Sequence, residues 1–265
     1  MVQKYLVYNE YKLFYEINGK GDNALIFIHG LCGNHNVWSK NIPAFTGKYR
    51  VLAIDMFGHG NSSKNITPKQ AFEEMPSVLQ SLIKKESLKN VVLIGHSIAG
   101  NILLSCIEKN IIDVLAYVFV DCTFNATGKV VNSRNKLADS LLDHSPHEIN
   151  HALVDWYKTM MDMHESKEDN GLILSSLKNL DGTWPLAFLK TTNIIRQVPQ
   201  TKLPVLIFES DWLTKDQPER SFGKVLPHVD YVKFAVSNHF FFVYEANKFN
   251  QMLQEFLEKI FRLIR

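Results

Sequence analysis

Short apolar runs, each stopped by Gly, Asp or a polar cluster, alternate along this chain with longer segments that are apolar on one face only. Runs this short and this rich in Val, Ile and Leu are typical of buried parallel strands, and the intervening pattern is typical of amphipathic helices. The pattern predicts strands at 24–28, 49–54, 90–95 and 114–120. It predicts helices at about 35–46, 68–87 and 98–109.

The two ends of the chain extend this pattern. Residues 5–18 alternate between apolar and polar positions and predict two antiparallel strands, at 5–8 and 12–17. Near the C-terminus the pattern predicts strands at 203–208 and 231–236 and helices near 217–226 and at about 245–263. Strands that alternate with helices favour an α/β fold, in which a mostly parallel sheet of eight strands is covered by helices on both faces.

The alternation stops between residues 124 and 198, where the chain is helical in pattern without a convincing strand. Within this stretch Ser145 and Glu148 have the spacing of a capping box, which marks the beginning of a helix. The residues Ile149, Leu153, Trp156 and Met160 then fall on one face of that helix. We interpret residues 124–198 as a helical insertion into one α/β domain.

Composition excludes several classes of protein. The 265 residues are 46% hydrophobic, which is ordinary for a globular protein with a sizeable core, and the formal net charge is only +2. A charge so close to neutral, with no long basic block, argues against a nucleic-acid partner. No segment has the length of a membrane span, and residues 1–5 lack the apolar core of a signal peptide.

The cysteines are Cys32, Cys106 and Cys122, an odd number without the spacing of a metal site. We therefore expect reduced thiols in a cytoplasmic protein, with no metal bound by these cysteines. The pattern leaves the oligomeric state open.

The most informative short segment is Gly95-His96-Ser97-Ile98-Ala99-Gly100, which joins the strand predicted at 90–95 to the helix that follows it. A sharp turn at this point exposes the Ser97 hydroxyl at the edge of the sheet, beside the unpaired N–H groups of a helix N-terminus. This is the layout of a nucleophile elbow, G-x-S-x-G, with Ala99 in place of the last glycine.

Three further segments occur in a matching order. His29-Gly30 follows the strand at 24–28, Asp55-Met56-Phe57-Gly58-His59-Gly60-Asn61-Ser62 follows the next strand, and His239 precedes the last helix. Together with the elbow, these four motifs make the chain resemble the α/β-hydrolase family over nearly its whole length. The resemblance implies that residues 1–123 and 199–265 form the hydrolase core. It also implies that residues 124–198 form a helical cap after the sixth strand.

The same resemblance implies a catalytic site. Ser97 corresponds to the nucleophile and His239 to the general base, and the backbone N–H groups of Leu31 and Ile98 correspond to the oxyanion hole. Family members usually place the acid that orients the histidine after the strand at 203–208, so Asp211 is the expected acid. The spacing from that strand to Asp211 is shorter than usual, and Asp121, Asp216 and Glu209 stay open as candidates for the same role.

The resemblance implies a serine hydrolase that cleaves a small or medium carboxylic ester through an acyl-enzyme, without a cofactor. Thioester or carbon–carbon bond hydrolysis by the same residues is one alternative. A ligand-binding receptor of the same fold with slow turnover is another, because the fold alone does not separate these functions.

Overall fold

The computed structural model describes residues 2–111, 113–122, 129–162, 166–178, 180–191, 200–214 and 229–263. Its strands are β1 (Val2–Tyr8), β2 (Tyr11–Asn18), β3 (Asn23–Ile28), β4 (Arg50–Ile54), β5 (Lys89–His96), β6 (Val114–Val120), β7 (Val205–Ser210) and β8 (Asp230–Phe234). They form one sheet of eight strands in the order β1-β2-β4-β3-β5-β6-β7-β8. The strands from β4 to β8 in this order pair in parallel, and β2 pairs antiparallel with both of its neighbours, β1 and β4.

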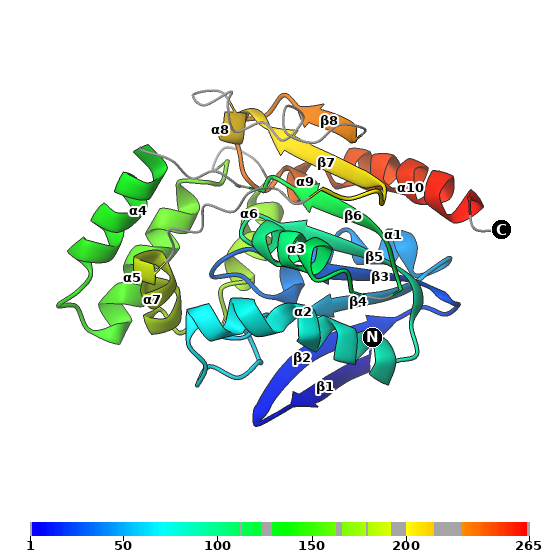
Figure 1. Cartoon of the computed structure of the whole chain (residues 1–265). Helices are drawn as coiled ribbons and strands as arrows, with labels where there is room; N and C mark the ends of the chain where they lie inside the picture. The colour runs from blue at the N-terminus through cyan, green and yellow to red at the C-terminus, as the bar shows by residue number, and fades with distance from the viewer. Residues whose placement is uncertain are drawn as a thin grey trace.

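The helices cover both faces of the sheet (Figure 1). They are η1 (His35–Trp38), α1 (Ile42–Phe45), α2 (Pro68–Lys85), α3 (Ala99–Glu108), α4 (Lys129–Ser140), α5 (Pro146–Lys158), α6 (Lys167–Ser175), α7 (Thr183–Thr191), α8 (Asp211–Thr214), α9 (Phe241–Tyr244) and α10 (Ala246–Arg262). In Figure 1, α2 and α3 cross in front of the sheet, and α10 lies behind it. The central strands are consequently buried on both sides, as the continuous apolar runs predict, and Ile26, Phe27, Leu93 and Ile94 have no solvent-exposed surface.

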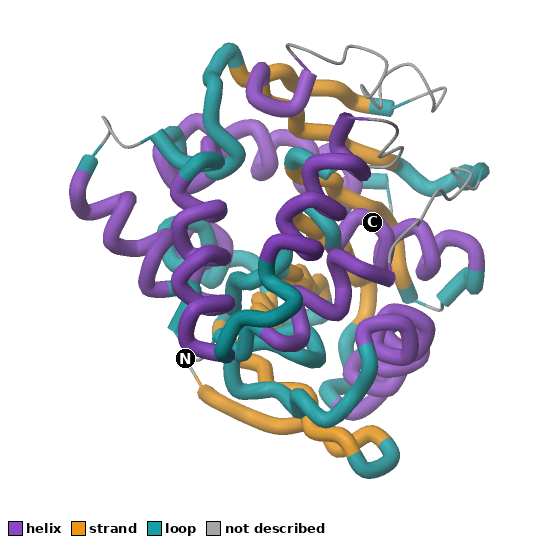
Figure 2. The backbone as a smooth tube through the Cα atoms, turned by 90° about the vertical axis from the view of Figure 1, so that its left-hand side faces the viewer, coloured by secondary structure: helices purple, strands orange, loops and turns teal. Residues whose placement is uncertain are grey.

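The insertion between β6 and β7 contains four helices and no strand among its described residues. The helices α4, α5, α6 and α7 occupy this part of the chain, and α5 begins with the expected capping box, in which Ser145 and Glu148 bond to each other's backbone N–H. Figure 2, seen from the side of the molecule where these helices lie, shows helices in front of the strands. The insertion therefore lies at the end of the sheet where β7 leads into α8 (Figure 1).

Two predicted helices differ from the observed elements. The helix expected at about 35–46 is replaced by η1 and α1, because Pro43 lacks an N–H and therefore begins a new helical turn rather than continuing one. The expected final helix at about 245–263 is observed as α10, and the short helix α9, which the sequence did not predict, precedes it. The helix predicted near 217–226 lies outside the described residues.

The loop after β4 braces the sheet beside the loop after β3. The Asp55 carboxylate accepts hydrogen bonds from the His35 N–H at 2.8 Å and the Asn61 N–H at 2.8 Å, and it contacts the His35 ring at 2.7 Å. Gly60 passes directly over this carboxylate at a φ of +50°, where an added Cβ would collide with Asp55 Oδ2. The motif containing Asp55 and Gly60 is accordingly structural in this chain.

Candidate active site

Ser97 lies on a tight turn between β5, which ends at His96, and α3, which begins at Ala99. Its φ is +55°, a left-handed conformation that is strained for a residue with a side chain. Backbone hydrogen bonds hold the turn, since the Ser97 N–H donates to Val120 O at 2.9 Å and Gly100 N–H donates to Ser97 O at 3.1 Å. The strand–turn–helix geometry predicted for this segment is confirmed, and strain of this kind is characteristic of functional turns.

His239 is buried, at 3% exposure, in the loop between β8 and α9. Its Nδ1 lies 2.6 Å from Oδ2 of Asp121, the residue directly after β6. The β6–β7 register places the ends of these strands together, and Ser210 donates to the same carboxylate from its backbone N–H at 2.7 Å and from its hydroxyl at 2.8 Å. The Asp121 carboxylate thus takes part in three hydrogen bonds, one with the His239 imidazole and two from Ser210.

The structure corrects the expected partner of His239 from Asp211 to Asp121. Strand β7 continues through Ser210, so Asp211 begins the short helix α8 and forms an ion pair with Lys233 of β8 at 2.8 Å. Glu209 accepts a hydrogen bond from the Tyr231 hydroxyl at 2.8 Å, and Asp216 lies outside the described residues. Ser210, the last residue of β7, supports the Asp121 carboxylate with two hydrogen bonds.

His96 links the turn at Ser97 to the loop of His239. The His96 Nε2 donates to the His239 backbone carbonyl at 3.1 Å, and the two imidazole rings lie 4.4 Å apart between centroids. Complete burial lowers the pKa of His96 well below its usual value, so this ring is neutral and Nε2 carries its proton. The neutral ring fixes the His239 loop without placing a second positive charge beside it.

The loop after β3 passes beside Ser97. A Cβ added to Gly30 would lie 2.9 Å from His96 Nδ1 and 3.1 Å from Ser97 Cβ, so only glycine allows this approach. His29 fixes the loop, because its Nδ1 donates to Gly30 O at 2.7 Å while its Nε2 accepts from the Met56 N–H at 2.9 Å. Burial lowers the pKa of His29 to about 4, which keeps this ring neutral, as two such hydrogen bonds require.

Leu31 and Ile98 lie at the two backbone positions expected to hold an oxyanion. Leu31 follows Gly30 in the loop beside Ser97, and Ile98 is the N-cap residue of α3. Among the backbone hydrogen bonds of the described turns and loops, neither the Leu31 nor the Ile98 N–H is a donor.

Replacing Gly30 by alanine should lower kcat/KM for p-nitrophenyl ester hydrolysis by about 10²-fold. The added methyl group displaces Ser97 or His96, and a displacement of ~1 Å in an active site lowers the rate by about this factor. The same overpacking should cost about 1–3 kcal/mol of unfolding free energy. Steady-state kinetics and thermal unfolding check both effects. Gly47→Ala is the matched control, because nothing lies within 4 Å of a Cβ added there. Equal kinetics in the two variants would contradict the close approach of Gly30 to Ser97.

Helices of the insertion contact both loops of the site. The His239 N–H donates to the backbone carbonyl of Met160, just after α5, at 2.8 Å. Tyr157 of α5 packs against Phe240 at 5.0 Å between ring centroids, and its hydroxyl is 3.2 Å from the position of a Cβ added to Gly33. Sequence reasoning missed the Met160 contact, since a backbone carbonyl leaves no signal in side-chain patterns.

Burial raises the pKa of the Asp121 carboxyl, and the two hydrogen bonds from Ser210 act in the opposite direction. An imidazolium at His239 would stabilise the carboxylate further, since the two groups are in hydrogen-bond contact and share one buried site. The three cysteines are free and buried, and burial raises the pKa of the Cys32 thiol, which favours its neutral form.

The described residues also bear on metal binding and on membrane insertion. No cluster of three or more His, Cys, Asp or Glu side chains with the arrangement of a metal site occurs among them. No helix in the same residues is long and apolar enough to cross a membrane.

Comparison with known proteins identifies the family. The family model of the alpha/beta hydrolase fold matches residues 23–246, most of the chain. The chain therefore belongs to the alpha/beta hydrolase fold family, which confirms both the resemblance seen in the sequence and the mostly parallel eight-stranded sheet.

Individual relatives match over shorter segments. The chain is 35% identical over 100 residues to the sn-1-specific diacylglycerol lipase ABHD11 of Mus musculus, a match that covers 36% of this chain and 32% of the relative. It is 32% identical over 92 residues to the dihydrolipoyllysine-residue acetyltransferase component of the acetoin cleaving system of Pseudomonas putida, covering 35% of this chain and 25% of the relative. The chain thus spans only a quarter to about a third of these curated relatives.

Among solved structures, an esterase from Exiguobacterium antarcticum superposes with a TM-score of 0.78 and 18% identity, and covers 94% of this chain and 96% of its own. At this identity the likeness shows the fold. The family model thus describes a hydrolase fold, and one of the partial matches is to a lipase.

Proposed function

We propose that this protein is a serine hydrolase that cleaves a small or medium carboxylic ester through an acyl-enzyme intermediate. The observation that carries the proposal is the hydrogen bond of 2.6 Å between His239 Nδ1 and Asp121. Ser97 lies on a strained strand-to-helix turn directly after His96, whose ring packs against that of His239. A nucleophile, a base and an acid that orients the base are the parts that acyl transfer requires.

In the proposed reaction, the Ser97 Oγ attacks the ester carbonyl carbon and His239 Nε2 accepts the hydroxyl proton. The carbonyl oxygen becomes an oxyanion, for which the N–H groups of Leu31 and Ile98 are the proposed donors. His239 then gives its proton to the leaving alcohol oxygen as the carbon–oxygen bond breaks. Water, deprotonated by His239, attacks the acyl-enzyme and releases the carboxylic acid and Ser97.

Asp121 has two roles in this scheme. Its carboxylate accepts a hydrogen bond from the Nδ1–H of His239, which selects the tautomer whose Nε2 is free to act as a base. When His239 becomes an imidazolium, the carboxylate stabilises the new charge. The two hydrogen bonds from Ser210 support the ionised form of this buried acid and hold it in place.

Residues 124–198 are proposed to form a cap over this site. The contacts of Met160 with the His239 loop and of Tyr157 with Phe240 support this assignment. A further contact joins the Tyr244 hydroxyl of α9 to the Asn170 side chain of α6 at 2.5 Å. A cap held in this way limits the size of substrate, which favours small and medium esters.

Turnover of p-nitrophenyl esters of increasing acyl length tests the function, with the corresponding thioesters assayed alongside. We expect saturable hydrolysis of the shorter esters, a fall in kcat/KM at the acyl length that the cap no longer accommodates, and slower turnover of the thioesters. Ser97→Ala is the blank. Saturable binding of esters with no turnover would instead indicate a receptor of this fold, and faster thioester cleavage would indicate a thioesterase.

A further inference from the structure

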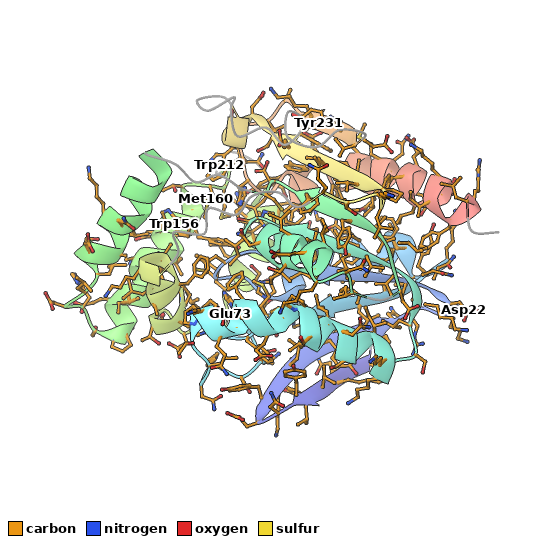
Figure 3. All side chains as sticks on the ribbon, in the orientation of Figure 1. Asp22, Glu73, Trp156, Met160, Trp212 and Tyr231 are labelled. Atoms are coloured by element: carbon orange, nitrogen blue, oxygen red, sulfur yellow. The ribbon has the colours of Figure 1, made fainter. Side chains whose placement is uncertain are left out.

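The aromatic ring of Trp212 is in direct contact with the His239 imidazole. The ring centroids are 4.4 Å apart and the ring planes are inclined by 40°. Trp212 is the second residue of α8, the short helix that directly follows β7 (Figure 1). Figure 3 labels its side chain beside that of Met160, whose carbonyl accepts the His239 N–H.

Two contacts hold Trp212 in this place. Asp211, its neighbour, forms the ion pair with Lys233 of β8. The backbone N–H of Trp212 donates to the Val236 carbonyl oxygen at 3.3 Å. These contacts join the beginning of α8 to β8 and to Val236, which lies between β8 and His239. The aspartate expected from the sequence to orient His239 thus belongs to the helix that carries the indole.

The exposures of the two rings differ strongly. His239 is 3% exposed and Trp212 is 37% exposed, so a buried imidazole is covered in part by an indole that itself meets solvent. Asp121, which bonds to Nδ1, and His96, which burial keeps neutral, both face the imidazole. The indole contributes no charge, but the face of an aromatic ring attracts a cation within about 6 Å of its centroid.

We propose that Trp212 is a positioning residue for His239: its indole holds the imidazole in place and stabilises the imidazolium that forms during the reaction. The inference rests on the proposed function, in which His239 becomes charged when Ser97 attacks. A contact that favours the imidazolium acts mainly in the transition state, so its loss lowers kcat more than it changes KM.

Tryptophan fluorescence tests the contact without any need for activity. An imidazolium quenches an adjacent indole far more than a neutral imidazole does. Acidification that charges His239 should therefore produce a fall in emission, in one step, that is separate from any quenching of Trp184 by His59, whose ring centroids are 4.9 Å apart. The step should disappear in Trp212→Phe and in His239→Gln. It should persist in Trp156→Phe, the matched control, which removes a partly buried tryptophan of α5. A step retained in Trp212→Phe, or absent from the unmodified protein, overturns the proposal.

Kinetics test the catalytic consequence. Trp212→Leu, which removes the aromatic face, should lower kcat by about 3- to 30-fold with KM changed less than about threefold, as expected for a lost cation–π contact. Trp212→Phe keeps a ring and should restore most of the activity. Leu and Phe variants with equal kcat would overturn the proposal. If esters are not hydrolysed at all but the fluorescence step follows the expected pattern, the contact stands and the proposed esterase function fails.

Discussion

Replacing Ser97 with alanine should lower kcat by at least about 10³-fold, because the acyl-enzyme no longer forms and only binding and oxyanion contacts remain. The melting temperature should stay nearly unchanged, since alanine has the same left-handed backbone strain at a φ of +55° as serine does. Steady-state hydrolysis of the best p-nitrophenyl ester and a thermal unfolding scan measure the two effects.

Ser87→Ala is the matched control for this variant. Ser87 has a φ of +50°, close to that of Ser97, but lies at the end of α2 on the surface. We expect its kcat to equal that of the unmodified protein. Full activity in Ser97→Ala would show that Ser97 is not the nucleophile.

Replacing Asp121 with asparagine should cost about 10²- to 10⁴-fold in kcat, whereas Asp211→Asn should cost less than about tenfold. The asparagine keeps the shape of the side chain, but it removes the charge that stabilises the imidazolium. Its amide group also donates to Nδ1, which selects the wrong tautomer of His239. Asp211→Asn breaks only a partly exposed ion pair with Lys233, and such pairs contribute little.

The variant with the larger loss of kcat identifies the aspartate that orients His239: Asp211, as the sequence pattern predicts, or Asp121, as the structure indicates. Both should be purified and compared at the same pH, with circular dichroism to confirm that each is folded. A larger loss of kcat for Asp211→Asn would assign the orienting role to Asp211 and contradict the role proposed for Asp121.

The architecture was predictable because the buried positions of each helix and strand are apolar in the sequence. The strand at 114–120 is observed at those residues as β6, and the central strands differ from prediction by one residue at an end. A parallel strand buried on both faces requires a continuous apolar run, and few other structures produce one. The helix expected at about 35–46 was wrong because Pro43 outweighs a helical spacing of apolar residues.

The partner of His239 was not predictable from spacing alone. Asp121 and Asp211 each follow a parallel strand, and β6 and β7 are neighbours, so both carboxylates start from the same edge of the sheet. What separates them is that β7 extends through Ser210 and turns directly into α8. The short distance between Phe208 and Asp211 was the one signal in the sequence against Asp211, and it left Asp121, Asp216 and Glu209 open.

Covalent labelling with a fluorophosphonate probe, followed by peptide mapping, tests most directly whether Ser97, His239 and Asp121 act together. The probe reacts only with a serine whose proton can be removed by an adjacent base. We expect one probe per chain, on Ser97, with labelling abolished in His239→Gln, strongly slowed in Asp121→Asn and slowed less than about tenfold in Asp211→Asn. Labelling of another residue, or undiminished labelling of Ser97 in His239→Gln, would contradict the account.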